Sequence, residues 1–130
     1  MREKPKILEG ESLEEVVFGF NVAGITFCNV DGLLKNIRIR NMYDDVSFIF
    51  VPEPDNIYDS NAVRVEIKLK SLNKEKKIGY IPKDSNHVAS WVLCEGKNEY
   101  KIRVLEWSIL GGTAGKDNCG VNINYKIERV

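Results

Sequence analysis

The chain from residue 51 to residue 65 reads Val-Pro-Glu-Pro-Asp-Asn-Ile-Tyr-Asp-Ser-Asn-Ala-Val-Arg-Val, a polar loop between two apolar runs. Those runs, residues 46–51 and 62–70, have the β-branched and aromatic composition of strands. Two prolines stiffen the entry to the loop, and its asparagines and aspartates favour turns because they hydrogen-bond to nearby backbone. Tyr58 is the exception, because turn formation does not require a large ring. The ring either lies on the folded domain or is held out for a ligand.

Length and composition indicate one soluble globular domain. The 130 residues are 43% hydrophobic and 29% charged, with no apolar run of membrane-spanning length and no signal peptide. Three widely spaced cysteines make neither a disulfide framework nor a zinc-binding pair, which favours a reducing, cytoplasmic compartment. We predict a charged N-terminal arm over residues 1–15, either loose or a short helix, and a single domain over residues 16–130.

Charge is unevenly distributed, although the formal net charge is zero. Residues 62–83 carry seven basic and two acidic side chains, a net charge of +5. The basic residues are Arg64, Lys68, Lys70, Lys74, Lys76, Lys77 and Lys83, and the acidic residues are Glu66 and Glu75. Two interpretations are open: lysines that keep a strand edge from pairing with other chains, or a patch that attracts phosphate.

Short strands dominate the pattern along the chain. Alternating or continuous apolar residues predict strands over residues 16–27, 46–51, 62–70, 77–81, 100–107 and 121–127. Gly19 and Gly24 indicate a bulge, a sharp bend or the close approach of a ligand within the first of these. A loop is expected over residues 111–120, between the last two strands.

Helices are fewer. One is expected near residues 84–94, with Asp84, Ser85 and Asn86 as candidate caps. Residues 33–40 fit either a helix or a strand. Several short antiparallel strands with one clear helix predict a mainly β fold, a small barrel or a sandwich.

The sequence has no recognisable catalytic signature. His87 is the only histidine, and its place in the predicted helix favours packing or surface exposure. Residues 112–117 resemble a phosphate-binding loop but lack its first glycine and its final serine or threonine. The carboxylates of Glu53, Asp55 and Asp59 fit turn chemistry better than a Mg²⁺ or Ca²⁺ site. We therefore expect that the protein is not an enzyme and has neither a metal nor another cofactor.

Three motifs together resemble the HIRAN domain family. They are Phe20-Asn-Val-Ala-Gly-Ile-Thr-Phe27, the loop quoted above, and Ile78-Gly-Tyr-Ile-Pro-Lys83, in the order and spacing of that family. The resemblance spans about residues 16–95. It implies a modified OB-like antiparallel β-barrel of about six strands with one or two flanking helices. It also implies a nucleic-acid-binding module that recognises the 3′-hydroxyl end of single-stranded DNA, as in relatives fused to a DNA translocase.

The resemblance also implies roles for individual residues. Phe27 and Tyr58 correspond to an aromatic pair that sandwiches the terminal base. Asp59 corresponds to a carboxylate that accepts a hydrogen bond from the 3′-hydroxyl. The residues that match positions near the sugar and phosphates are Asn56, Tyr80 and Lys83.

Thr26 departs from the family pattern, because the DNA-binding relatives have an arginine there that contacts a phosphate. Single-stranded DNA, through its 3′ end, is the expected partner, with a DNA-repair or replication protein as a further candidate and no membrane. Thr26 and the zero net charge leave a second class of function open. In that alternative the chain is a protein-interaction or scaffold module that keeps the barrel without DNA affinity.

Overall fold

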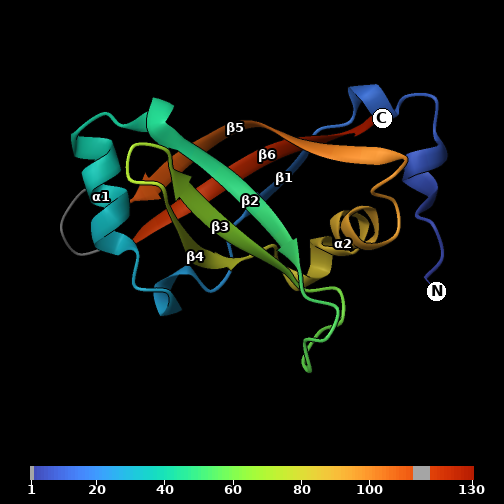
Figure 1. Ribbon diagram of the computed structural model, residues 1–130, viewed down its shortest axis with the longest axis horizontal. Helices are drawn as coiled ribbons and strands as arrows, with labels where there is room; N and C mark the ends of the chain where they lie inside the picture. The colour runs from blue at the N-terminus through green and yellow to red at the C-terminus, as the bar shows by residue number, and fades with distance from the viewer. Residues whose placement is uncertain (1, 113–117) are drawn as a thin grey trace.

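The computed structural model describes residues 2–112 and 118–130, and this part of the chain is mainly β (Figure 1). It has six antiparallel strands and two flanking α-helices, as predicted, and the strands form two separate sheets. One sheet has the order β1 (Phe18–Asn21), β6 (Cys119–Arg129), β5 (Tyr100–Gly111), and the other has the order β2 (Val46–Pro52), β3 (Val63–Leu69), β4 (Lys74–Tyr80). The helices are α1 (Asp31–Ile39) and α2 (His87–Cys94). Neither has the length and apolar character needed to cross a bilayer.

The core lies between the two sheets. Every second residue of β3 and of β6 is buried, because successive side chains of a strand point to opposite faces. The aromatic ring of Phe50, from β2, packs 5.8 Å from that of Phe20 and 5.5 Å from that of Tyr125, measured between centroids. These contacts join one sheet to the other. Burial raises the pKa of Tyr125 to about 12.

Among the described residues, strand-type backbone hydrogen bonds join the two sheets along one side only. There, Ala23 and Tyr80 form an isolated antiparallel bridge, with backbone hydrogen bonds of 2.8 and 2.9 Å. On the other side β2 and β5 are the outer strands of their sheets, and among the described residues neither pairs with a further strand. The sheets are therefore not closed into a barrel, and the OB-like barrel is not confirmed.

Several element boundaries differ from those predicted. The strand expected over residues 16–27 ends at Asn21, because Gly24 takes a left-handed conformation (φ 73°) and a 3-10 turn, η3 (Ile25–Phe27), follows it. The ambiguous segment after Asp31 is helical and buries Leu34 and Ile37, which lie three residues apart on one face. Strands β5 and β6 extend into the loop expected over residues 111–120, and residues 113–117 of that loop lie outside the described part.

The N-terminal arm is not loose. Residues 6–9 and 13–15 form 3-10 turns, η1 (Lys6–Glu9) and η2 (Leu13–Glu15), which bury Leu8 and Leu13 completely or nearly so. The Arg2 guanidinium donates hydrogen bonds to Asn61 Oδ1 and to Ser90 Oγ, so it links the polar loop to α2. The arm therefore packs on the domain, and its separation from a domain over residues 16–130 stays a prediction.

Gly79 gives a test of the junction between the sheets. A Cβ atom there would lie 2.3 Å from the carbonyl oxygen of Ala23 and 2.6 Å from Val22 Cγ1. We expect Gly79→Ala to lower the free energy of unfolding by roughly 2–3 kcal/mol, measured by chemical denaturation. Gly32→Ala in α1 is the control, because nothing lies within 4 Å of its Cβ and alanine favours helices. Equal stability of both variants would contradict this account of the junction.

Candidate nucleic-acid interface

The loop between β2 and β3 is shaped by its own polar side chains. Asn56 Oδ1 accepts hydrogen bonds from the backbone N–H groups of Tyr58 (2.9 Å) and Asp59 (3.2 Å). Asp59 Oδ1 accepts one from the N–H of Asn61 (2.9 Å). These are the local side-chain to backbone bonds that the asparagines and aspartates of the sequence predict. They fix the direction in which Tyr58 and Asp59 leave the backbone.

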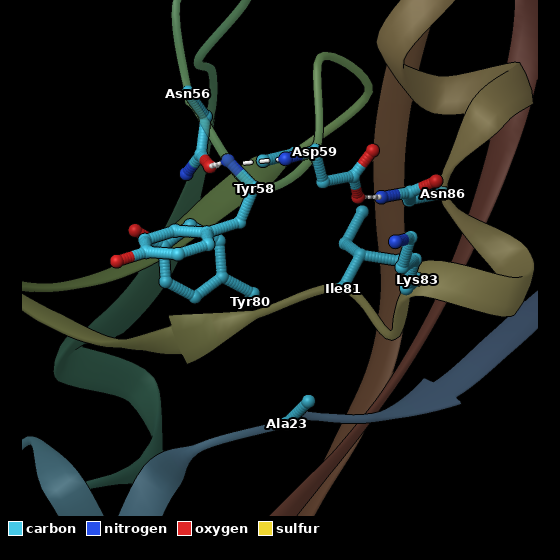
Figure 2. Close-up of a pocket in the computed structure, with 9 residues that line it drawn as sticks. Ala23, Asn56, Tyr58, Asp59, Tyr80, Ile81, Lys83 and Asn86 are labelled. Carbon is cyan, nitrogen blue, oxygen red and sulfur yellow. Dashed lines mark hydrogen bonds between the residues drawn. The ribbon is translucent and has the colours of Figure 1, made fainter.

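A pocket of about 380 Å³ lies beneath this loop, between the end of β4 and the 3-10 turn η5 (Lys83–Ser85) (Figure 2). Its floor comes from the junction of the sheets, since Ala23 and Tyr80 both line it. The residues that line it are Ala23, Asn56, Tyr58, Asp59, Ala62, Tyr80, Ile81, Lys83 and Asn86. Three segments far apart in the sequence thus contribute to one cavity.

Five of the seven predicted site residues line this pocket, namely Asn56, Tyr58, Asp59, Tyr80 and Lys83. The other two do not. Thr26 lines a smaller cavity of about 130 Å³ with Asp31 and Cys119. Phe27 is 91% exposed on η3, which packs against β4. A sandwich of Phe27 and Tyr58 around a base therefore stays a prediction.

The ring of Tyr58 does not lie on the domain. It is 84% exposed, and its neighbour Ile57 is 87% exposed. Of the two interpretations of this residue, the structure contradicts the one in which the ring packs on the folded domain. An exposed aromatic face at the mouth of a pocket is free to stack with a ligand.

Asn86 is a pocket residue that the sequence did not single out for this role. It was a candidate helix cap, yet its side chain makes no capping hydrogen bond to α2. It is 2% exposed and donates instead to Asp59 Oδ2, at 2.8 Å. Figure 2 shows this amide and the Lys83 ammonium on the same side of the pocket as the Asp59 carboxylate. In the sequence, only its position three residues after Lys83 connects Asn86 with the predicted site.

Glu53 accepts hydrogen bonds from three side chains, two of which belong to pocket residues. Its Oε1 accepts from Asn56 Nδ2 and from the Tyr80 hydroxyl, both at 3.0 Å, and its Oε2 forms a 2.7 Å ion pair with Arg64. Burial alone would raise the pKa of Glu53, but these three donors together hold that pKa below its usual value. The loop and β4 are thus joined through one ionised carboxylate.

Two of the basic side chains between residues 62 and 83, Arg64 and Lys77, have partners within the protein. Arg64 also pairs with Glu66 at 2.7 Å, and Glu66 and Glu53 together raise the pKa of the guanidinium. Lys77 donates to the Tyr80 hydroxyl at 3.1 Å, and its ammonium lies 4.4 Å from the centre of the Tyr80 ring. Arg64 is therefore neutralised within the protein, and it is not available to a phosphate.

No metal site is apparent in residues 2–112 and 118–130, where no three or more His, Cys, Asp or Glu side chains come together. Cys28, Cys94 and Cys119 are free thiols. The absence of a metal or cofactor stays a prediction.

Glu53 gives a pH-dependent test. Because its pKa is lower in the folded state, its contribution to stability is complete above the unfolded pKa and is lost as pH falls through the folded pKa. We expect Glu53→Gln to lower the free energy of unfolding by roughly 1–2 kcal/mol at neutral pH. Thermal unfolding should show this difference shrinking as pH falls below the unfolded pKa and through the lowered folded pKa. Glu106→Gln, on the exposed face of β5, is the control, and a pH-independent difference for Glu53→Gln would contradict the assignment.

Comparison with known proteins agrees with the motifs in the sequence. The model of the HIRAN domain family matches residues 16–108, which include β1, the polar loop, β4, α2 and most of β5. Neither the curated proteins nor the solved structures yield a match to this chain. HIRAN domains are nucleic-acid-binding modules. Because the match covers most of its length, this chain belongs to the HIRAN domain family.

Proposed function

We propose that this protein binds the 3′-hydroxyl end of single-stranded DNA in the pocket beneath the β2–β3 loop. The observation that carries the proposal is the convergence of an exposed aromatic ring, a carboxylate and an ammonium group on one open cavity. These groups belong to Tyr58, Asp59 and Lys83. The proposed role is binding without catalysis.

Tyr58 is proposed to stack with the terminal base. Stacking on an aromatic side chain is worth roughly 1–3 kcal/mol per base and accepts any of the four bases. Phe27 is proposed as the second ring of a sandwich. Two observations support this role of Phe27. Its side chain is highly exposed, and η3 packs against β4, the strand that carries Tyr80 to the pocket.

Asp59 is proposed to accept a hydrogen bond from the 3′-hydroxyl. Each of its carboxylate oxygens already accepts one hydrogen bond, from Asn61 or from Asn86. A carboxylate has about four acceptor positions, so capacity for a hydroxyl donor remains. A 3′-phosphate offers no donor at neutral pH and would bring like charges together.

Asn56, Tyr80 and Lys83 are proposed to lie near the sugar and the phosphates. Lys83 supplies positive charge at the pocket, whereas Arg64 is held by two glutamates. Contact with only two or three phosphates predicts a modest salt dependence. For single strands the slope of log K against log salt is about −0.7 per phosphate, so we expect about −1.5 to −2.

The test compares an oligonucleotide ending in a 3′-hydroxyl with the same strand ending in a 3′-phosphate. Fluorescence polarisation should show the hydroxyl end binding about tenfold more tightly or better, since roughly 1.4 kcal/mol corresponds to tenfold. Tyr58→Ala should weaken both strands, and Asp59→Asn should reduce the preference between them. Equal affinity of the wild-type protein for the two ends would refute recognition of the hydroxyl.

Asn86→Ala is the matched control for Asp59→Asn. It removes the amide that holds Asp59 Oδ2 but keeps the carboxylate. We expect it to weaken both strands to a similar degree and to preserve the preference for the hydroxyl end. A loss of preference in Asn86→Ala would indicate that the shape of the loop, and not the charge of Asp59, discriminates between the ends.

Thr26 allows a gain-of-affinity test. If position 26 lies near the bound strand, as in the DNA-binding relatives, Thr26→Arg adds a phosphate contact. Affinity should rise at low salt, and the log–log salt slope should become more negative by about 0.7. Thr26→Lys should act in the same direction and Thr26→Glu in the opposite one. Unchanged slopes in these variants would place the strand away from Thr26.

The alternative is a protein-interaction or scaffold module without DNA affinity. The pairing of Arg64 with Glu53 and Glu66 favours it, because a guanidinium beside the pocket is already neutralised. A DNA-repair or replication protein is the partner class that we would test first. Absence of single-strand binding at low salt would favour this alternative.

A further inference from the structure

The outer edge of β4 is covered at one end only. At Tyr80 it pairs with Ala23, and η3 packs beside it. Toward the hairpin, no described residue pairs with this edge at Lys74, Glu75 or Lys76, and all three side chains are exposed. Alternate backbone N–H and C=O groups of such an edge are available to hydrogen-bond with another strand.

An apolar cavity of about 400 Å³ runs along this open part of the edge. Leu33 of α1 lies on one side of it, and Ile67 and Leu69 of β3 form its floor. Leu72, in the hairpin turn, also lines it and is 54% exposed. Figure 1 shows the hairpin beside α1, at the end of β4 that is farther from α2. Covering apolar surface in this position lowers the free energy of the system.

Two lysines at this cavity carry charge without a partner. Lys74 and Lys76 pair across the sheet with Leu69 and Ile67, so they share the inward face of those buried residues. Among the described residues neither forms an ion pair, whereas Glu75 lies 3.9 Å from Lys68. Inward-facing lysines at an edge disfavour pairing with a neutral strand, because the added strand would desolvate them. Carboxylates on an incoming strand would compensate the charge.

We propose that this edge binds an extended acidic segment of a partner protein, which adds a strand to β4 and covers the cavity. Backbone hydrogen bonds would supply affinity, and the lysines and leucines would select a segment that carries both carboxylates and apolar side chains. Nucleic acid is the competing ligand for the lysines. Phosphate binding, however, uses neither an apolar floor nor a free strand edge. The site lies at the other end of β4 from Tyr80, so the proposal is independent of 3′-end binding.

The test uses a capped synthetic peptide of about eight residues built from glutamate and leucine, a length within the usual range of strands. Its twins have lysine in place of glutamate, or N-methylated amides at alternate positions that remove backbone donors. With the wild-type protein, the acidic peptide should bind at least about tenfold more tightly than the lysine twin, as two lost charge pairs would give. It should also bind more tightly than the N-methylated twin, which lacks backbone donors for the edge of β4. It should shift the backbone NMR signals of Leu72, Lys74 and Lys76, and leave those of Tyr58 and Lys83 unchanged.

Lys74→Glu combined with Lys76→Glu should abolish the preference for the acidic peptide. Lys101→Glu is the matched control, because Lys101 is also exposed on an outer strand, β5. Equal binding of the acidic and basic peptides would overturn the proposal. An N-methylated peptide that binds as well as its parent would also overturn it. The same holds for a single-stranded oligonucleotide that shifts the NMR signals of Lys74 and Lys76 when the peptide does not.

Discussion

The pair of backbone hydrogen bonds between Ala23 and Tyr80 is the constraint on which the site depends. It is the one strand-type bridge between the two sheets in the described part of the chain, and both of its residues form the floor of the pocket. The approach of the two backbones requires glycine at position 79, and the chain before Ala23 comes from the opposite sheet. The pocket therefore depends on the way the sheets meet, and residues of the β2–β3 loop complete its lining.

The two ends of β4 differ in how far their charged side chains are paired. At the pocket end, Glu53 and Glu66 neutralise Arg64, and Lys77 is held by Tyr80, so the charge near the proposed DNA end is small and local. At the hairpin end, Lys74 and Lys76 remain uncompensated within the described residues. A window with a net charge of +5 in the sequence is thus divided into a paired part and an unpaired part. Only the three-dimensional pairing makes this division visible.

The sequence predicted the strands well, because side-chain alternation is a local signal. The runs that became β3 and β6 show it clearly, and the asparagines of the β2–β3 loop make the turn bonds expected of them. The end of β1 was missed, since β-branched residues continue past Asn21 while Gly24 turns the chain. The sequence left the arm open between a loose segment and a short helix, because its charged residues outnumber the leucines that anchor it.

For the site, the family motif identified five residues that meet in one pocket. It did not identify Asn86, whose hydrogen bond to Asp59 connects residues 27 positions apart. It also could not establish whether the barrel closes, because that depends on how the edges of β2 and β5 approach each other. Contacts of this kind are set by the packing of whole sheets and leave no local pattern in the sequence.

The pairing of β1 with β6 has a consequence for how the chain folds. Phe18 lies opposite Tyr125, so the first sheet joins segments that are far apart in the sequence, whereas β2, β3 and β4 follow one another as antiparallel neighbours. During synthesis the second sheet can form early, but the first must wait until β6 has emerged. Until then Ala23 has no neighbouring sheet to hold it beside Tyr80, and the partly made chain exposes an apolar face. The floor of the pocket is therefore complete only after the first sheet has assembled against the second.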